Sequence, residues 1–368
     1  MFCLSNKDIN KLSNITNEDI VINFCGVNRA TTEGEYIAGN ETFVINLVES
    51  FGKSRPFLVH LSSLMVYGFE DINNKDLSAY QRFFIDSKLN GEKHLINNYP
   101  NDKLCIIRPS NIFGFDCEPY YNNLLVTLIH EKITGNQKIT KINKNCKRNF
   151  LSVSGLSQQI MNIIIQKRFG TYNIISNNDI KYDELVNILY DNNKPDYISI
   201  VDDASSVMNQ KYLDDKNILI HEDFPTKIFE TESKMINLLK INESIEIKKL
   251  GKLSQSRGDM VEISDLNNRR LYLITIKPNA VRGNHYHFIQ HEHFYINRGK
   301  ILYLFAHKEN PEAILIKILD EGTLIKVNPL IIHSLANNFI GEDSEIIIVS
   351  TQEFIPNQSP DTVYVPLL

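Results

Sequence analysis

The sequence has no paired-cysteine pattern and no run of residues suited to a membrane. Its five cysteines include no CxxC spacing, and the last of them is Cys146. A disulfide framework or a cysteine zinc site would use paired cysteines, so both are excluded and we expect buried free thiols. No stretch reaches the roughly 18 apolar residues of a membrane helix. Residues 1–10 also lack the basic and apolar blocks of a signal peptide.

These absences predict a cytoplasmic protein without a membrane partner. The formal net charge is −5 at pH 7, and the chain contains no basic tract. Proteins that bind nucleic acid usually carry a basic patch, so we expect no nucleic-acid partner. Histidine, in contrast, is present and unevenly distributed, because six of the ten histidines follow residue 284. We therefore expect the chemistry to lie in the C-terminal part.

The first half alternates short apolar runs with longer amphipathic segments. At 368 residues the chain is about twice the usual domain length, so we expect two domains. Runs rich in branched residues occur at 19–24, 57–62 and 104–108, as in strands that are buried on both faces of a sheet. Helical segments such as 43–51 and 85–97 separate them. This βαβ rhythm predicts an α/β domain with a parallel sheet.

The composition changes near residue 250. Residues 196–250 are charged and rich in Asn, and we interpret them as helices that lead into a linker. From Lys252 onward, short alternating strands are separated by turn signals such as Arg298-Gly299-Lys300, which predicts an antiparallel sandwich or barrel. We place the two domains at residues 1–245 and 246–368.

A group of histidines forms the strongest pattern in the chain. His285 and His287 are two residues apart, so on a strand both project from the same face and can bind one ion. Glu292 follows after a gap long enough for a turn, and His333 is available from a distant strand. Three imidazoles and a carboxylate suit Zn²⁺, Fe²⁺, Ni²⁺ or Mn²⁺, and the spacing does not choose among them. The alternative is that these are ordinary core or surface residues without an ion.

The same residues resemble the cupin pattern, which is HxH, four residues, Glu, six residues and Gly, followed later by His, three residues and Asn. The chain departs from this pattern at Asn279, where cupins usually have glycine, and at Leu330, where a Pro-x-Gly turn is usual. Asparagine tolerates the left-handed backbone conformation that glycine provides. The resemblance implies an all-β cupin, or jelly-roll, barrel in the C-terminal domain.

Three ordered segments of the first half resemble the extended short-chain dehydrogenase/reductase family: Ser62–Gly68, Lys88–Glu92 and Arg108–Gly114. Together with the cupin pattern, they make the chain similar to two-domain capsular-polysaccharide enzymes that are 3-epimerase and 4-reductase for UDP-2-acetamido-2,6-dideoxy-hexos-4-uloses. The resemblance implies a Rossmann-like reductase-type domain that uses NADPH, a cupin that holds zinc, and a homodimer. The implied substrate is a UDP-linked 4-keto-6-deoxy-HexNAc sugar, with its binding residues expected at Arg29, Arg108 and Asn111.

Two features of an active reductase have no counterpart in this sequence. No glycine precedes Gly26, so the GxxGxxG turn for a dinucleotide is expected to be absent with its strand and helix, and NADP(H) is not an expected ligand. The catalytic Tyr-x-x-x-Lys of the family begins here at Phe84, which has no proton to give. We interpret Ser63 and Lys88 as relics of a degenerate reductase, retained as a scaffold, a sugar-nucleotide platform or a dimerisation surface.

The expected activity is epimerisation at C3 in the cupin. A hydrogen beside the C4 ketone is acidic enough for a protein base to remove, and the enediolate can be reprotonated on its other face without a cofactor. Lys277 and Tyr286 are the candidate proton carriers. His285 is another candidate base, because Arg282–His285 resembles the Arg-Gly-x-His segment of metal-free epimerases of the rhamnose pathway, although the HxH and Glu spacing favours metal binding. The alternatives are a still bifunctional enzyme, a non-catalytic sugar-nucleotide-binding cupin, and an iron dioxygenase.

Overall fold

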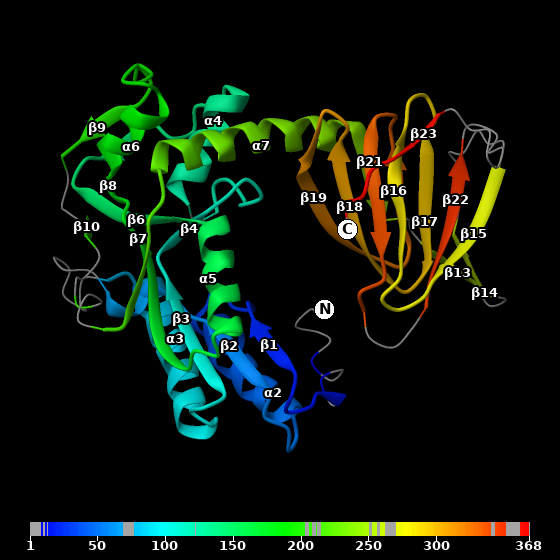
Figure 1. Cartoon of the computed structure of the whole chain (residues 1–368). Coiled ribbons are helices and arrows are strands. Elements are labelled where there is room, and N and C mark those ends of the chain that lie inside the picture. Colours follow the sequence, from blue (N-terminus) through cyan, green and yellow to red (C-terminus); the bar gives the residue numbers. More distant parts are fainter. Residues whose placement is uncertain are drawn as a thin grey trace. The chain divides into compact units, whose positions relative to one another are not determined.

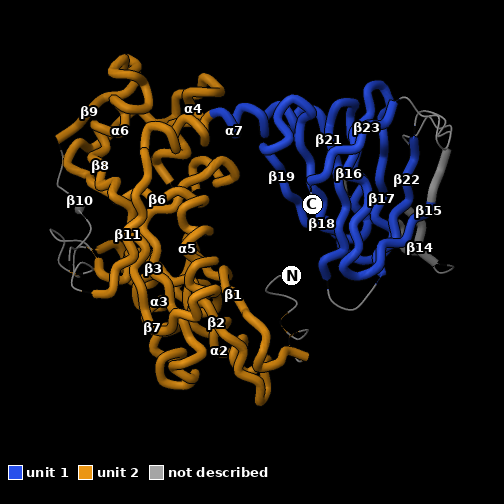
Figure 2. Tube along the Cα trace, in the orientation of Figure 1, with its two compact units in different colours: residues 1–4, 233–368 blue, residues 5–232 orange. Residues whose placement is uncertain are grey.

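The protein consists of two compact units. The computed structural model describes residues 9, 12, 14–68, 77–121, 123–202, 206–207, 211, 215–249, 252–255, 258–261, 270–339, 343–350 and 361–367. One unit is formed by residues 5–232, and the other contains residues 233–368 (Figure 2). The division falls inside helix α7, Phe224–Ser244, whereas the sequence predicted a boundary after residue 245. The charged, Asn-rich composition that predicted a linker belongs in part to the surface of this continuous 21-residue helix.

The N-terminal unit is built on a five-stranded parallel sheet with the strand order β1-β2-β3-β7-β11 (Figure 1). The first four residues of both β2 and β3 are buried, as predicted for strands with both faces covered. The sequence therefore located the central strands correctly. The strand bounds are Ile20–Asn23 for β1, Phe57–Leu61 for β2, Leu104–Pro109 for β3, Gly170–Ser176 for β7 and Asn217–Ile220 for β11.

Helices pack against this sheet and join its strands (Figure 1). Helix α5 contributes Leu156, Ile160 and Ile163 to a buried cluster with Val59 of β2 and Ile107 of β3. Helix α3 begins with a capping box, in which Ser78 accepts from the Gln81 amide and the Gln81 side chain accepts in return from the Ser78 amide. The helices are α1 (Glu33–Ile37), the π-helix Ala38–Thr42, α2 (Phe43–Ser50), the 3₁₀ turn Leu64–Tyr67, α3 (Ala79–Asn98), α4 (Leu124–Thr134), α5 (Val153–Ile165) and α6 (Tyr182–Leu189).

Shorter strands complete the N-terminal unit. Strand β6 pairs in parallel with β4 and β10 and antiparallel with β8, while β5 pairs in parallel with β9. The bounds are Asn111–Phe113 for β4, Lys141–Asn143 for β5, Cys146–Ser152 for β6, Asp179–Lys181 for β8, Ser199–Val201 for β9 and Ser206–Val207 for β10. Strand β4 continues the chain beyond β3 and carries Asn111 to the carboxyl end of the main sheet.

The C-terminal unit contains two five-stranded antiparallel sheets (Figure 1). One has the order β12-β20-β17-β22-β15, and the other has the order β19-β18-β21-β16-β23. Strands β13 (Lys252–Gln255) and β14 (Gly258–Val261) form a separate hairpin. The bounds are Ile245–Lys249 for β12, Arg270–Ile276 for β15, Val281–His287 for β16, Glu292–Arg298 for β17, Lys300–His307 for β18, Asn310–Asp320 for β19, Thr323–Val327 for β20, Ile331–Ala336 for β21, Ser344–Ser350 for β22 and Thr362–Tyr364 for β23.

The two antiparallel sheets enclose an apolar interior. Phe294 of β17, in one sheet, packs edge-on against Tyr303 of β18, in the other, with ring centroids 5.4 Å apart. Tyr303, Phe305 and Ile325 have no exposed surface. Side chains from both sheets therefore form one core, as in a jelly-roll barrel. The predicted fold class, a parallel α/β domain followed by an all-β cupin-type barrel, is confirmed.

Two turns at the barrel's mouth adopt the left-handed conformation. Asn279 has φ +63°, so the prediction that asparagine takes the place of glycine there is confirmed. Leu330 has φ +69°, which is costly for a residue with a Cβ. Two backbone hydrogen bonds hold it: the Leu330 amide donates to the His287 carbonyl at 2.7 Å, and the Leu330 carbonyl accepts from Lys308 at 3.0 Å. The irregular turn before His333 is therefore accommodated by local pairing.

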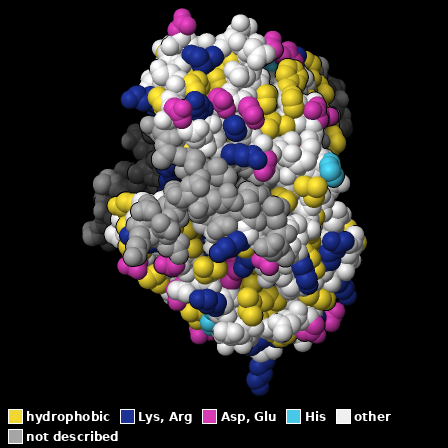
Figure 3. All heavy atoms as spheres, turned by 90° about the vertical axis from the view of Figure 1, so that its left-hand side faces the viewer, with side chains coloured by type: hydrophobic (Ala, Val, Ile, Leu, Met, Phe, Trp, Pro, Cys, Tyr) yellow, Lys and Arg dark blue, Asp and Glu magenta, His cyan; other side chains and the backbone are white. Residues whose placement is uncertain are grey.

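The cysteines and the surface agree in part with the sequence. Cys105 is buried, whereas Cys25, Cys117 and Cys146 are only half-buried; all four are free thiols, and Cys3 lies outside the described residues. In the described part of the face in Figure 3, Lys and Arg side chains lie among Asp and Glu rather than in a block of one sign. In the described part of the chain, no helix combines the length and hydropathy needed to span a bilayer.

A test of the barrel's geometry is the replacement of Gly283 by alanine. Gly283 has φ +88°, and an added Cβ would lie 2.7 Å from the His333 carbonyl oxygen. Gly52 is the matched control, because it has φ +57° but nothing within 4 Å of an added Cβ. We expect Gly52→Ala to cost about 1 kcal/mol of unfolding free energy and Gly283→Ala about 2–4 kcal/mol in urea unfolding. Equal losses would contradict the close approach of β16 to β21.

Candidate metal centre and a second cavity

The four residues predicted to bind a metal converge inside the barrel. His285 and His287 lie on β16, His333 lies on the neighbouring β21 directly opposite His285, and Glu292 begins β17 in the other sheet. Each residue offers one nitrogen or oxygen, and these four atoms all lie within 4.8 Å of one another. The alternation of side chains along β16 brings both histidines to one face, as the sequence predicted.

The three imidazoles point their Nε2 atoms at one carboxylate oxygen. Glu292 Oε2 lies 2.9 Å from His333 Nε2, 3.3 Å from His287 Nε2 and 3.9 Å from His285 Nε2. Glu292 Oε2 and His333 Nε2 are buried and have no hydrogen bond of good geometry. Buried polar atoms without partners are rare in folded proteins, so this group of atoms fits a bound cation.

Three of the four residues, His287, Glu292 and His333, have polar contacts on the side away from the cluster. His333 Nδ1 lies 3.1 Å from the Ile331 carbonyl, to which it can donate, and His287 Nδ1 lies 3.2 Å from the Thr362 hydroxyl. Gln290 Nε2 donates to Glu292 Oε1 at 3.1 Å, so only Oε2 faces the histidines. Metal-binding histidines in proteins usually donate their other ring N–H to such a partner.

The electrostatics of the cluster suit a cation. Burial, followed by the neighbouring His333, lowers the pKa of His285 to about 4, so its imidazole is neutral at pH 7. Burial alone would raise the pKa of Glu292, but the close imidazoles of His287 and His333 outweigh it and hold this pKa well below its usual range. A charged carboxylate and a neutral imidazole are both ligands for Zn²⁺, Fe²⁺, Ni²⁺ and Mn²⁺.

The two predicted proton carriers do not join this cluster. Tyr286 stands between the two histidines of β16, so its side chain lies on the opposite face of the strand, where its ring packs against Phe288 with centroids 5.3 Å apart. Lys277 is exposed in the turn that joins β15 to β16, and its carbonyl accepts from the Ala280 amide. Strand alternation and the position of this turn therefore place both residues outside the cluster, and their role as proton carriers stays a prediction.

Sequence reasoning missed Asp361, which fixes the loop after His287. Its carboxylate accepts from the amides of Phe288 at 2.8 Å, Ile289 at 2.9 Å and Gln290 at 3.0 Å. It also lies 3.8 Å from His287 Nδ1. Asp361 comes more than seventy positions after this loop, and no local spacing rule connects the two. Only the pairing of β23 with β16 brings them together.

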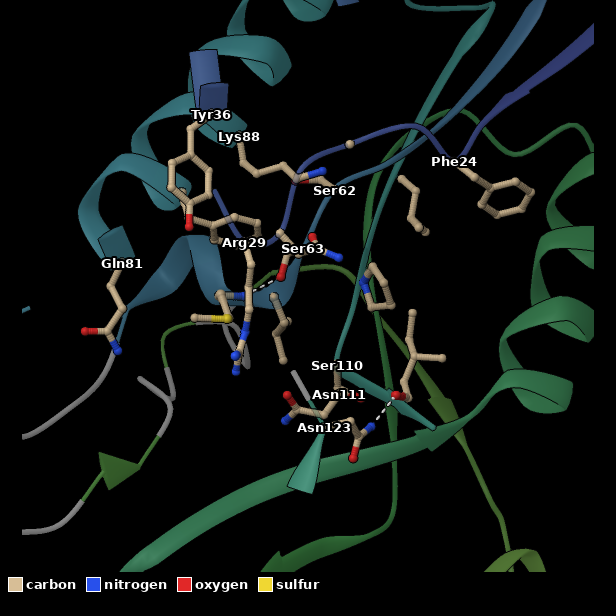
Figure 4. A pocket seen from close by; sticks show the side chains of 18 of the residues that line it. Phe24, Arg29, Tyr36, Ser62, Ser63, Gln81, Lys88, Ser110, Asn111 and Asn123 are labelled. Carbon is tan, nitrogen blue, oxygen red and sulfur yellow. Dashed lines mark hydrogen bonds between the residues drawn. The ribbon is translucent and has the colours of Figure 1, made fainter. Parts of the chain in front are cut away.

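A cavity of about 720 Å³ opens at the carboxyl ends of β1, β2 and β3 in the N-terminal unit (Figure 4). Ser63 and Lys88, which were predicted from the reductase resemblance, line the cavity. Arg29 and Asn111, which were predicted to bind substrate, line it as well. The Phe84 ring also lines the cavity, and Lys88 Nζ lies 6.0 Å from its centroid. The position that carries a tyrosine in the reductase pattern is therefore an apolar wall.

Arg108, which the sequence predicted to bind substrate, has other partners. Its guanidinium donates to both oxygens of the buried Glu92, from Nη2 at 2.6 Å and from Nε at 3.1 Å, and to the Tyr67 hydroxyl at 2.7 Å. Ser62 donates to the same carboxylate. Arg108 is not among the residues that line the cavity. The bidentate pairing engages most of the guanidinium within the protein, and the substrate role of Arg108 stays a prediction.

The barrel matches a known family. Residues 253–363 match the family described as "Polysaccharide biosynthesis C-terminal domain". The match includes all four residues of the candidate metal centre, and it confirms the relationship to polysaccharide biosynthesis that the sequence predicted for this domain. No curated protein matches the chain.

Several solved structures are similar to the chain. The capsular polysaccharide assembling protein CapF from Staphylococcus aureus has 20% identity and a TM-score of 0.42, over 98% of this chain and 90% of that chain. A UDP-N-acetylglucosamine 4-epimerase from Bacillus cereus has 20% identity and a TM-score of 0.47, over 63% of this chain and 81% of that chain. The sugar 3,4-ketoisomerase QdtA from Thermoanaerobacterium thermosaccharolyticum has 16% identity and a TM-score of 0.29, over 33% of this chain and 87% of that chain.

The metal centre is tested by the substitution His333→Gln, which removes one buried imidazole. We expect the purified wild-type chain to take up a divalent ion in equilibrium dialysis with Zn²⁺ or Mn²⁺, and the affinity of the variant to fall by more than about 100-fold. The exposed His291, whose Nδ1 lies 3.2 Å from the Asn328 side chain, provides the control variant His291→Gln. Equal metal uptake by both variants would contradict the assignment.

The role of Arg108 is tested by Arg108→Ala, which leaves the Glu92 carboxylate buried without its cation. Breaking a buried ion pair in this way usually costs about 3–5 kcal/mol, and we expect a loss of that size in urea unfolding. The control is Arg298→Ala, because the Arg298 side chain is 53% exposed and pairs with Glu345 at 3.1 Å near the surface. That variant should lose no more than about 1 kcal/mol. A small effect at Arg108 would instead favour a role in binding.

Proposed function

We propose that this chain is a nucleotide-sugar C3-epimerase whose active site is the barrel. The proposed substrate is a UDP-linked 2-acetamido-2,6-dideoxy-4-keto-hexose, and the proposed process is the synthesis of a deoxy-amino sugar for a polysaccharide. The observation that carries the proposal is the convergence of three imidazole Nε2 atoms on Glu292 Oε2, in a segment that matches a polysaccharide-biosynthesis domain. The resemblance of the sequence to bifunctional epimerase and reductase enzymes supplies the substrate class.

The residues of the site favour chemistry that stabilises negative charge on a carbonyl oxygen. A divalent ion held by His285, His287, Glu292 and His333 would act as a Lewis acid toward the C4 oxygen. Removal of the C3 proton places charge on that oxygen, so stabilisation there lowers the barrier. The apolar side chains around the cluster exclude water and strengthen this effect, because Phe294 packs against the His333 ring at 5.4 Å.

Neither Lys277 nor Tyr286 belongs to the cluster, so we also consider residues beside the cluster as proton carriers. Among the four cluster residues, the His285 side chain is the most exposed at 20%. It faces the ring of Tyr364 on β23, with centroids 5.7 Å apart, and Tyr364 is largely exposed. We therefore propose the Tyr364 phenol as one proton carrier and keep His285 among the metal-binding residues. A hydroxyl so close to the open side of the cluster can reach a bound sugar.

The proposal is tested by incubating the full chain with UDP-4-keto-6-deoxy-GlcNAc in D₂O and following the sugar by NMR. We expect deuterium to appear at C3 with no reduction at C4, with or without NADPH, because the barrel alone carries the chemistry. Glu292→Gln should slow the exchange by about 100-fold or more, since one charged ligand of the stabilising centre is lost.

The matched control for this experiment is His291→Gln, which lies next to Glu292 in sequence but is exposed. Its exchange rate should equal that of the wild type. Reduction at C4 that consumes NADPH would establish a bifunctional enzyme instead, and complete absence of C3 exchange would favour a non-catalytic sugar-nucleotide-binding barrel.

A further inference from the structure

The amine of Lys88 ends at the wall of the N-terminal cavity. Lys88 lies on α3, and its side chain extends toward Ser62 of the cavity lining (Figure 4). The residue is 5% exposed. Gly26 makes room for it, because an added Cβ at that position would lie 2.6 Å from Lys88 Nζ. The amine is thus held by packing in a largely dry position with access to a hollow.

Lys88 has no carboxylate partner in the part of the chain that the structure describes. No Asp or Glu oxygen there lies within 4.0 Å of Nζ. Glu92, one turn later on α3, is already bound by Arg108 at 2.6 Å and by Ser62. The amine lies over the Phe84 ring, 6.0 Å from its centroid. A buried ammonium without an ion pair is unusual, because its charge is not compensated.

The surroundings favour the neutral amine. Burial lowers the pKa of Lys88 to about 8, and it outweighs Glu92 on α3 and Cys25 after β1, which both act in the opposite direction. His60 on β2 faces the same region and is itself neutral, since burial and then Lys88 lower its pKa to about 3. At pH 7 roughly a tenth of the Lys88 side chains are therefore unprotonated. Only the neutral amine is a nucleophile.

The cavity wall suits a hydroxylated ligand. Apart from Lys88, its polar lining includes hydroxyls and amides from Ser62, Ser63, Ser110, Asn111 and Asn123. Arg29, also in the lining, adds a cation that can pair with a phosphate. Phe84 occupies the position of the tyrosine in the reductase pattern, so there is no phenol through which the lysine could act. The amine is consequently a nucleophile that this cavity offers to a ligand.

We propose that Lys88 forms a reversible imine with the carbonyl group of a hydroxylated ligand of the keto-sugar class. The neutral Nζ attacks the carbonyl carbon and gives a carbinolamine. Loss of water then forms the C=N bond, and the two hydrogens that leave nitrogen depart with the carbonyl oxygen. The step needs no oxidant or reductant. This site shares a ligand class with the proposed epimerase but belongs to the other domain.

The test is reductive trapping on the full chain. The protein is incubated with UDP-4-keto-6-deoxy-GlcNAc and sodium cyanoborohydride, and the adduct is located by intact mass and peptide mapping. We expect labelling at Lys88 at least about 10-fold above that at Lys93, an exposed lysine on the same helix, and more of it at pH 9 than at pH 7. UDP-GlcNAc, which has no ketone, should give no adduct. Absence of label at Lys88, or equal label on exposed lysines, would overturn the inference.

Two variants separate the amine from the packing around it. Lys88→Met removes the nucleophile and should abolish the adduct, whereas Lys93→Met should leave it unchanged. Gly26→Ala keeps the amine but places a methyl group 2.6 Å from Nζ, so it should reduce trapping at least several-fold in a folded protein. Full trapping in Gly26→Ala would contradict the geometry. The readout is a covalent mass at Lys88, not deuterium at C3, so failure here is distinguishable from failure of the epimerase proposal.

Discussion

The barrel depends on one buried carboxylate. Glu292 carries charge into an interior that is otherwise lined by side chains such as Phe294 and Tyr303, and burial of an unpaired charge is costly. The fold compensates by aiming three Nε2 atoms at Oε2 and one amide donor at Oε1. A divalent cation held by these groups would balance the charge of the carboxylate. Strands β16, β17 and β21 bring these groups together.

The N-terminal unit balances the charge of its buried carboxylate in a different way. Its buried carboxylate, Glu92, receives a bidentate guanidinium from Arg108 and a hydroxyl from Ser62, so its charge is balanced within the protein. Lys88, on the same helix, has no carboxylate oxygen within 4.0 Å in the described part of the chain. The two units therefore differ in the buried group that can accept a ligand. In the barrel it is the Glu292 carboxylate, which can bind a cation, and in the N-terminal unit it is the Lys88 amine, which can bind an anion or attack an electrophile.

Local spacing made part of this predictable. The HxH and Glu spacing located the residues of the candidate metal centre because side chains on a strand alternate. The branched runs located the central strands because parallel sheets are buried on both faces. The same alternation places Tyr286 on the other face of the strand, because its neighbours on both sides face the cluster. The partners of Arg108 were not predictable, because the meeting of β3 with α3 depends on tertiary packing and not on spacing. Asp361 was not predicted for the same reason, since β23 pairs with β16 only in the folded barrel.

The replacement of a phenol by Phe84 changes what the neighbouring lysine can do. In a reductase the lysine acts through the phenol, so loss of the phenol removes the acid and leaves the lysine without that task. If Lys88 had no role in the cavity, a solvent-exposed or ion-paired lysine at this position would be equally compatible with the fold. Instead Gly26 preserves the space for Nζ, and Glu92 is held away by Arg108. The packing thus maintains an uncompensated amine against a cavity, which is costly to stability and is understandable if a ligand uses it.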